Sequence, residues 1–234
     1  MPVMKKSFLF IHRKMHPLIS WVRSQPLIIK LLFSIKIHKG MVIHYDTTTI
    51  LFRKALKKEV KNQDKVLEMG IGQAALLSLY LAKTKKIIPH GVDISTNRVK
   101  DSSSTAQLNS VEVDFRQSDL FSNVHNIYDV IFFNPPYVHT SAGLALNLTK
   151  RLELESDAPW NGGIDGTAVL KKFIECSNPH LAPTGKLMIG VQDFYVRDSV
   201  IKEMAGLSNY YIHNTVSSLL NPSKIYVLKK VSRS

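Results

Sequence analysis

The chain has 234 residues, of which 44% are hydrophobic and 21% are charged, a composition typical of a globular protein that buries a substantial core. Its 31 basic and 18 acidic residues give a formal net charge of +13, which favours a polyanionic partner such as RNA, the ribosome or DNA, although solvated lysines also explain much of the charge. The single cysteine, Cys176, excludes an intramolecular disulfide and a cysteine zinc site.

Residues 1–45 are basic and contain no acidic residue, and we expect them to form a short helical extension. Apolar residues recur there at helical spacing: Leu27, Ile28, Leu31, Leu32 and Ile35. This apolar face either packs on the main domain or docks onto a macromolecule or a membrane surface. Two lysines interrupt residues 26–37, and no secretory signal pattern is present, so we expect a cytoplasmic protein without integral membrane association. An organelle transit peptide is the alternative.

From Asp46 onward, helical and strand patterns alternate. The predicted helices cover residues 48–60, a segment from 73, residues 95–108, residues 166–181 and residues 196–206. The predicted strands cover residues 65–70, 90–95, 111–117, 128–133, 185–193, 210–218 and 224–231. Residues 135–166 are predicted to be irregular, and a short turn joins the last two strands. This alternation predicts one α/β domain over residues 46–234, with a mostly parallel seven-stranded sheet and one antiparallel edge strand.

A glycine-containing segment, EMGIGQA (68–74), follows the first predicted strand. Glycines there allow a tight turn and let a ligand approach the backbone, although a purely structural turn is an alternative. About 20 residues later the second strand ends in Asp93, a position from which an acid binds ribose hydroxyls. Glu68 would repel a phosphate and attract an ammonium group, which favours S-adenosylmethionine over a nicotinamide cofactor.

Two further motifs follow the third and fourth predicted strands. After the third strand, Asp119 either caps a turn or binds an adenine amine, with Leu120 against the ring. After the fourth strand comes NPPY (134–137), which is either a plain turn or a stiffened segment that holds Asn134 and Tyr137 in place. Because ligands bind beyond the carboxyl ends of strands in open α/β sheets, the four motifs predict a single crevice.

These motifs resemble those of class I S-adenosylmethionine-dependent methyltransferases of the NPPY group, which methylate planar amide or amine nitrogens. The matching segments, in the order of that family, are VLEMGIGQA, GVDIS, QSDLF and FNPPYV. Residues 155–173 resemble the segment after NPPY in the HemK/PrmC branch, which methylates a glutamine side chain of peptide chain release factors. The resemblance covers roughly residues 42–231 and implies a Rossmann-like fold with S-adenosylmethionine as cofactor.

The resemblance also implies a role for each site residue. The side-chain oxygen of Asn134 and the carbonyl of Pro135 would accept the N–H groups of the target amide and aim its nitrogen at the sulfonium methyl group. Tyr137 would stack on the planar amide, and Pro136 would line the substrate opening. Trp160 either covers that opening or is simply packed. The expected cofactor contacts are Thr47, Glu68, Gly70, Gly72, Asp93, Asp119, Leu120 and Asn134.

Several alternatives stay open. NPPY is shared with adenine methyltransferases, so an exocyclic adenine amine in RNA or DNA is a second target class, and a small molecule is a third. A cofactor-binding subunit without catalytic activity is the alternative in which the protein is not an enzyme. In bacterial members of the HemK/PrmC branch a helical substrate-binding domain precedes the catalytic domain. Here only a basic stretch of about 40 residues stands in its place. The nine histidines show no metal-ligand spacing, so no metal is expected, and Cys176 is expected in the core.

Overall fold

The computed structural model describes residues 22, 24–41, 43, 45–151, 156, 159–218 and 221–231. Predictions about most of the basic extension, about residues 152–155 and 157–158, and about the start of the last turn therefore lie outside the described residues. The described helices are α2 (Pro26–Phe33), α3 (Thr47–Glu59), α4 (Leu76–Lys85), α5 (Thr96–Leu108), α6 (Thr140–Ala145), α7 (Leu148–Arg151), α8 (Ala168–Ser177), the 3₁₀ helix η1 (Asn178–His180) and α9 (Asp198–Leu207). The strands are β1 (Val66–Met69), β2 (His90–Asp93), β3 (Asp114–Gln117), β4 (Tyr128–Phe133), β5 (Leu181–Gln192), β6 (Tyr210–Ser218) and β7 (Asn221–Lys230).

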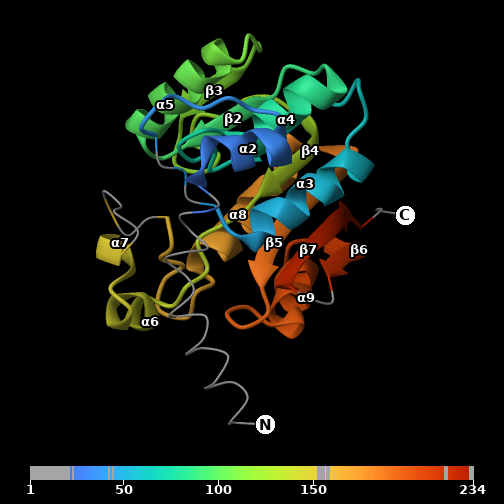
Figure 1. Cartoon of the computed structure of the whole chain (residues 1–234). Coiled ribbons are helices and arrows are strands. Elements are labelled where there is room, and N and C mark those ends of the chain that lie inside the picture. Colours follow the sequence, from blue (N-terminus) through green and yellow to red (C-terminus); the bar gives the residue numbers. More distant parts are fainter. Residues whose placement is uncertain are drawn as a thin grey trace.

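The seven strands form one sheet in the order β3-β2-β1-β4-β5-β7-β6 (Figure 1). Strands β1 to β5 pair in parallel, whereas β7 pairs antiparallel with both β5 and β6. The predicted α/β fold with a mostly parallel sheet is confirmed, and the antiparallel pairing lies at one edge, where β7 inserts between β5 and β6. The strand order reverses between β1 and β4, and such a reversal opens a crevice at the carboxyl edge of the sheet.

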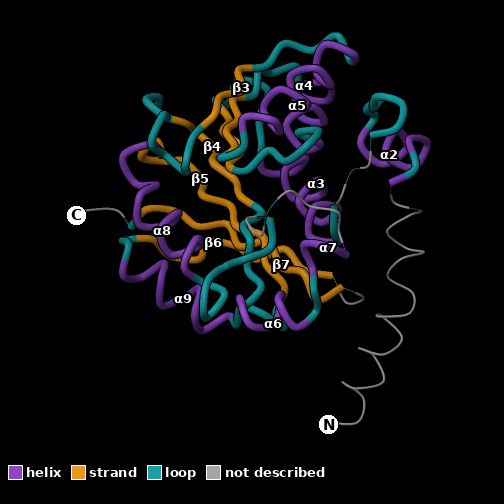
Figure 2. The backbone as a smooth tube through the Cα atoms, turned by 90° about the vertical axis from the view of Figure 1, so that its left-hand side faces the viewer, coloured by secondary structure: helices purple, strands orange, loops and turns teal. Residues whose placement is uncertain are grey.

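Helices cover both faces of the sheet, as the edge-on view in Figure 2 shows. On one face, Val130 and Phe132 of β4 belong to a core cluster with residues of α2, α3 and α4. On the other face, Ile131 and Phe133 belong to a second cluster with residues of α8 and α9. Because side chains alternate along a strand, one apolar run supplies both cores.

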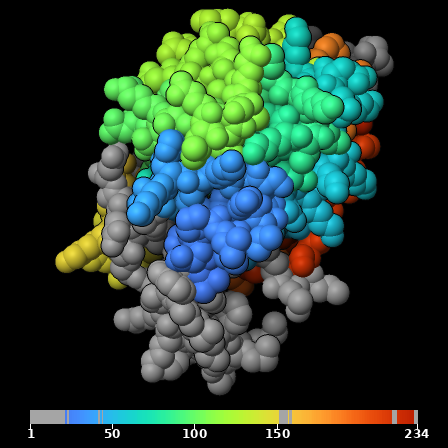
Figure 3. Space-filling model, turned by 45° about the horizontal axis from the view of Figure 1, so that its top comes forward, coloured from blue at the N-terminus to red at the C-terminus, as the bar shows by residue number. Residues whose placement is uncertain are grey.

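Helix α2 packs on the main domain, beside α4 (Figure 3). Its fully buried side chains are Ile29 and Phe33, one helical turn apart. Of the predicted apolar face, Ile35 is fully buried and Leu32 packs against the core, as the packing alternative expects, whereas Leu27 and Leu31 are 65% and 69% exposed. Arg53 of α3 explains part of this orientation, because its guanidinium donates a hydrogen bond to the carbonyl of Leu32 and thereby fixes the end of α2.

Three other sequence predictions are corrected by the structure. Residues 135–166 are not wholly irregular, since α6 and α7 lie there. Strand β5 begins at Leu181, four residues before the predicted start at Gly185. Cys176 is exposed, because α8 turns a different stripe toward the sheet: Leu170, Phe173, Ile174 and Ser177. Within the described part of the chain, no helix combines the length and apolar character needed to cross a membrane.

The burial of α2 predicts unequal costs for truncating its two apolar faces. Phe33→Ala should lower the free energy of unfolding by about 3 kcal/mol, because the removed ring leaves a cavity in the core. Leu31→Ala, on the exposed face of the same helix, should change it by about 0.5 kcal/mol or less. Urea denaturation measures both values. Equal costs for the two variants would contradict this packing.

Candidate active site

A cavity of about 420 Å³ lies at the carboxyl ends of β1, β2 and β4. Its size falls within the range of small-molecule and cofactor sites. Seven of the residues predicted from the sequence line it: Gly70, Gly72, Asp93, Asp119, Leu120, Asn134 and Pro136. The structure therefore brings all four sequence motifs to one crevice.

The turn after β1 is shaped by two glycines with positive φ angles, Gly70 at +68° and Gly72 at +66°. A Cβ atom on Gly70 would lie 2.8 Å from the ring of Phe133, so this glycine allows close packing of the turn on β4. A Cβ atom on Gly72 would meet nothing within 4 Å. Because Gly72 also lines the cavity, that open space belongs to the site, and its backbone is accessible to a ligand.

Asp93, at the end of β2, is 4% exposed and connects the second strand to this turn. Its Oδ2 accepts a hydrogen bond from Gly72 N at 3.0 Å, and its Oδ1 accepts one from Ser95 N at 3.0 Å. Arg98 Nη1 lies 4.0 Å from Oδ1. Each carboxylate oxygen has a second lone-pair direction, so Asp93 can still accept a hydroxyl hydrogen bond from a ligand in the cavity.

Asp119 and Leu120 line the same cavity after β3. Leu120 has a φ of +49°, and Ser118 Oγ donates a 2.7 Å hydrogen bond to its carbonyl, so the turn is locally fixed. The side chain of Asp119 is 56% exposed and forms an ion pair with Lys172 Nζ at 3.2 Å. The carboxylate of Asp119 is a hydrogen-bond acceptor beside the apolar side chain of Leu120, and this pair suits a planar ring that carries an amine, such as adenine.

Glu68 lies outside the residues that line the cavity. Its Oε2 accepts hydrogen bonds from Ser78 N at 3.0 Å and Ser78 Oγ at 2.5 Å, in the first turn of α4. Burial raises the pKa of Glu68 to about 8, against the lowering effect of these hydrogen bonds. In the structure Glu68 thus joins β1 to the start of α4, and its predicted contact with a cofactor ammonium group stays a prediction.

Asn134 lines the cavity and carries a buried, unpaired acceptor. Its Nδ2 lies 3.4 Å from Asp46 Oδ1 and 3.4 Å from Thr49 Oγ1, both acceptor-capable oxygens. Its Oδ1 is buried and has no hydrogen-bond partner. A flipped amide would turn Oδ1 toward the carboxylate of Asp46, which would be repulsive, so Asp46 fixes which atom of the amide is left free. Leaving a buried acceptor unpaired costs roughly 1–3 kcal/mol.

Asp46 holds several elements together at this point. As the N-cap of α3, its Oδ1 accepts a hydrogen bond from Thr49 N at 3.0 Å. Its Oδ2 accepts one from the hydroxyl of Tyr137 at 2.7 Å and one from Gln192 Nε2 at 3.2 Å. Burial and the negative charge of Asp46 raise the pKa of Tyr137 well above its ordinary value, so this hydroxyl stays protonated and donates. No local sequence pattern indicates that Asp46 orients Asn134, which lies 88 residues away.

Besides Glu68, four predicted site residues do not line the cavity. Tyr137 is 7% exposed, its hydroxyl is bound to Asp46, and its ring centroid lies 5.7 Å from that of Tyr195. Trp160 is buried, and its Nε1 donates a 2.8 Å hydrogen bond to Thr149 Oγ1. Thr47 Oγ1 lies 3.1 Å from Ser223 Oγ. Their contacts with substrate or cofactor stay predictions, and so does that of Pro135, which is buried between Asn134 and Pro136.

The glycine-rich segment 161–166 supports the backbone of NPPY. Gly162 N donates a 2.9 Å hydrogen bond to the carbonyl of Val138, and a Cβ atom on Gly162 would lie 2.8 Å from Tyr137 Cα. A Cβ atom on Gly166 would lie 2.7 Å from the carbonyl oxygen of Tyr137. These glycines are therefore required for close backbone packing, which keeps the segment after β4 in place.

Sequence reasoning missed other residues of the cavity: Gln73, Ile94, Arg98, Ser118, Pro159, Asn161 and Val169. Gln73, Ile94 and Ser118 each stand beside a motif residue, so the loops after β1, β2 and β3 could have suggested them. Asn161 and Val169 reach the cavity from the segment after NPPY. The pairing of Val138 with Asn161 is among the long-range contacts that bring that segment back beside the chain that follows β4.

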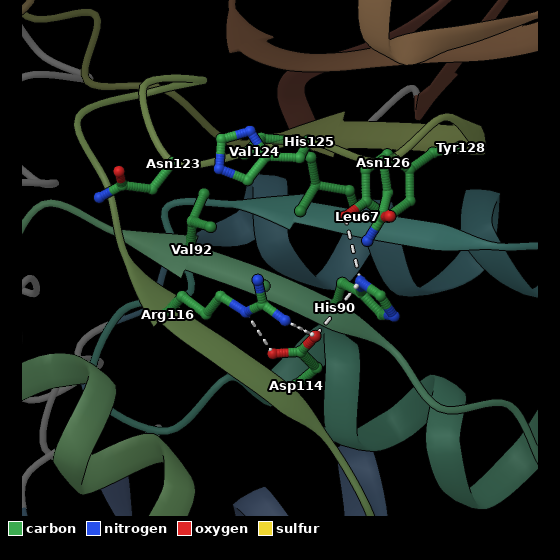
Figure 4. Close-up of a pocket in the computed structure, with 11 residues that line it drawn as sticks. Leu67, His90, Val92, Asp114, Arg116, Asn123, Val124, His125, Asn126 and Tyr128 are labelled. Atoms are coloured by element: carbon green, nitrogen blue, oxygen red, sulfur yellow. Dashed lines mark hydrogen bonds and ion pairs between the residues drawn. The ribbon is translucent and has the colours of Figure 1, made fainter.

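A second, much smaller cavity of about 10 Å³ lies between β2, β3 and residues 123–128 (Figure 4). Asp114 accepts two 2.8 Å hydrogen bonds from Arg116, and His90 Nδ1 lies 3.0 Å from the hydroxyl of Tyr128. The space suits about one water molecule, so this polar cluster joins strands and holds no larger ligand. Within the described residues there is no group of three or more His, Cys, Asp or Glu side chains that could hold a metal ion.

Comparison with solved structures defines the class of fold. A methyltransferase from Pyrococcus furiosus superposes with a TM-score of 0.66 at 17% identity, covering 92% of this chain and 97% of that one. The sheet order, the Gly-x-Gly turn and the cavity at the carboxyl edge are those of class I S-adenosylmethionine-dependent methyltransferases. The methyltransferase small domain matches residues 40–159, half of the chain, and the chain belongs to this family.

Two curated relatives are similar in sequence. A putative protein N5-glutamine methyltransferase of Methanocaldococcus jannaschii is 37% identical over 142 residues, which cover 60% of this chain and 66% of the relative. The release factor glutamine methyltransferase of Haemophilus influenzae is 29% identical over 170 residues, which cover 66% of this chain and 57% of the relative. The chain thus spans less than two thirds of the length of these relatives.

The raised pKa of Glu68 predicts a pH-dependent stability. The folded state keeps a proton that the unfolded chain releases above pH 4.5, so this carboxyl stabilises the fold at low pH. That contribution should be lost as the pH rises from about 4.5 to about 8. Glu68→Gln retains an acceptor for Ser78 but does not titrate. As the pH rises over this range, the unfolding free energy of the wild type should therefore fall relative to that of the variant. Urea denaturation from pH 5 to pH 8 measures the difference, and a constant value would contradict the assignment.

Proposed function

We propose that the chain is an S-adenosylmethionine-dependent methyltransferase that methylates the side-chain amide nitrogen of a glutamine in a protein. The observation that carries the proposal is the buried, unpaired Oδ1 of Asn134, a residue that lines the cavity. This oxygen has no hydrogen-bond donor as a partner. A primary amide could supply one, because its planar nitrogen carries two N–H groups. The names of the two curated relatives support the same chemistry.

The residues of the cavity fit S-adenosylmethionine. Asp93 would accept ribose hydroxyls, Asp119 with Leu120 would bind the adenine, and the open space at Gly72 would admit the ligand against the backbone. The cofactor supplies a methyl group on a sulfonium, so transfer needs only a correctly placed nitrogen. Methyl transfer breaks the S–C bond, its electron pair stays on sulfur, and the nitrogen that gains the methyl group loses one proton to solvent.

Asn134 would supply the positioning. An amide nitrogen is a weak nucleophile because its lone pair is delocalised into the carbonyl. Asn134 Oδ1 and the carbonyl of Pro135 would accept the two N–H bonds, align the nitrogen with the methyl group and favour the positive charge that develops on it. Asp46 would keep the amide of Asn134 in the orientation that makes this possible.

An exocyclic adenine amine is the second candidate target, because it also carries two N–H bonds on a planar nitrogen. The observation that favours it is the net charge of +13. A protein that accompanies nucleic acid, as in a ribosome or another translation complex, is compatible with both the amide chemistry and the charge. We therefore place the protein amide first and the adenine second.

A methyl-transfer panel separates these targets. Labelled S-adenosylmethionine is incubated with the protein and with purified release factors, ribosomes, tRNA or DNA. The proposal expects label on protein, located by mass spectrometry at the side-chain nitrogen of a glutamine. Label confined to adenine nitrogens would favour the second candidate, and failure to bind S-adenosylmethionine in calorimetry would overturn both.

Asn134→Ala should separate cofactor binding from catalysis. Loss of the positioned acceptor should lower the rate of methyl transfer roughly 100-fold, equivalent to about 3 kcal/mol of transition-state stabilisation. Calorimetry should show near-normal affinity for S-adenosylmethionine, since the predicted adenine and ribose contacts remain. Asn62→Ala, at an exposed asparagine outside the cavity, is the matched control and should behave as wild type. Unchanged turnover in Asn134→Ala would remove Asn134 from this role.

Asp46→Ser tests the orientation of Asn134 apart from helix capping. Serine is also a good N-cap, so α3 should stay capped, whereas the lost hydrogen bonds from Tyr137 and Gln192 should lower the free energy of unfolding by roughly 1–3 kcal/mol. The shorter, neutral side chain should no longer hold the amide of Asn134, and kcat should fall about 10-fold with little change in cofactor affinity. If kcat falls only in proportion to a loss of folded protein, followed by circular dichroism, Asp46 has no positioning role.

A further inference from the structure

Exposed lysines lie on α3 and on or just after α2 and α4. These segments, blue to green in Figure 3, lie beside one another on one side of the molecule. We call this surface the basic face and define it by the exposed residues Lys30, Lys36, Lys54, Lys57, Lys58 and Lys86. Three of them lie at successive positions on one side of α3, at i, i+3 and i+4. The basic face therefore extends over three packed helices.

The partly buried Lys83 lies beside the basic face, close to two of its lysines. Lys83 Nζ donates 2.8 Å hydrogen bonds to the carbonyl of Ser34 and to Asn109 Oδ1. Partial burial, followed by the nearby ammonium groups of Lys36 and Lys30, lowers the pKa of Lys83. The chain has thus gathered three cations where α2 meets α4, against their mutual repulsion.

No neighbouring carboxylate neutralises this charge. Within the described part of the chain, no acidic oxygen lies within 4.0 Å of the amino groups of the basic face. Glu59, the residue after Lys58, is bound elsewhere, to Lys186 Nζ at 2.9 Å. Such an uncompensated positive surface attracts a polyanion and increases its rate of association.

The basic face is separated from the active site. Helix α3 begins beside Asn134, where Asp46 caps it, and runs away from the cavity toward Glu59. Lys57 lies ten residues after Thr47, which corresponds to roughly 15 Å along the helix axis. A partner on the basic face therefore leaves the cavity free to receive a side chain of another molecule.

We propose that the basic face binds the phosphodiester backbone of double-helical RNA. Ammonium groups are compact cations that suit phosphate oxygens, and their spread over three helices matches an extended row of phosphates. A membrane surface suits the basic face less well, because Leu27 and Leu31 are the large exposed apolar side chains of α2 and form no broad apolar face for insertion. The choice of RNA over DNA rests on the proposed function, since a protein amide presented together with a polyanion is characteristic of a ribonucleoprotein.

Two triple variants of the whole chain test the assignment. Lys30→Gln/Lys36→Gln/Lys57→Gln removes three cations from the basic face. Lys171→Gln/Arg197→Gln/Lys202→Gln removes three exposed cations from the layer of α8 and α9 on the opposite face of the sheet. Both lower the formal net charge from +13 to +10, so only the location of the charge differs.

Binding to a fluorescent RNA hairpin with a stem of about 20 base pairs is followed by anisotropy between about 50 and 200 mM salt. The basic-face variant should bind about 10-fold or more weakly and show a shallower dependence of log K on log salt, because fewer counterions are released. The control variant should stay within about 2-fold of wild type.

Equal weakening in both variants would overturn the proposal, because net charge alone would then explain binding. Equal or tighter binding to a DNA duplex of the same sequence would assign the surface to DNA. Binding to phosphatidylserine vesicles that depends on Leu27 and Leu31, without RNA binding, would assign it to a membrane surface. Calorimetry with S-adenosylmethionine, run on the same variants, tests the proposed function separately, since both variants should bind the cofactor as wild type does.

Discussion

The carboxylate of Asp46 is the contact on which the geometry of the site depends. It caps α3, and its two oxygens also receive the amide of Asn134, the hydroxyl of Tyr137 and the side-chain amide of Gln192. The helix before β1 is thereby joined to the segment after β4 and to the end of β5. A carboxylate can accept this many hydrogen bonds because it offers about four lone-pair sites and no competing donor. Asp46 is occupied by these donors, and Oδ1 of Asn134 is left buried without a hydrogen-bond partner in the structure.

The sheet supplies the remaining geometry. Parallel strands β1, β2, β3 and β4 end at the same edge, and the reversal of strand order between β1 and β4 leaves the cavity there. The prolines and the packed glycines of residues 161–166 hold the backbone of NPPY still, so the unpaired oxygen has a defined position before any substrate arrives. Such preorganisation reduces the entropy that substrate binding must overcome. The unpaired acceptor is a local cost to folding that a donor on the substrate would remove.

Local patterns predicted most of the fold and much of the cavity, and long-range contacts account for what they missed. Strand and helix periodicity placed β1, β4, β6, α3 and α5 close to their observed bounds, and the residues after each parallel strand were assigned to one crevice. The hydrogen bond between Asp46 and Asn134 spans 88 residues, so no local pattern contains it. The contact of Glu68 with the cofactor stays a prediction, and the hydrogen bonds that the first turn of α4 donates to Glu68 are a contact that no local pattern indicated. Apolar spacing alone does not say which of two adjacent stripes of α2 meets the domain, so the sequence did not single out Ile29 and Phe33 as its buried residues.

The most direct test of the central claim is the structure of a ternary complex with S-adenosylhomocysteine and a glutamine-containing peptide from a methylated protein. The account predicts the target nitrogen within about 3.2 Å of both Asn134 Oδ1 and the carbonyl oxygen of Pro135, with Asp46 still bound to the amide of Asn134. A target nitrogen held elsewhere, with Asn134 Oδ1 turned toward the protein or satisfied by another group, would contradict it.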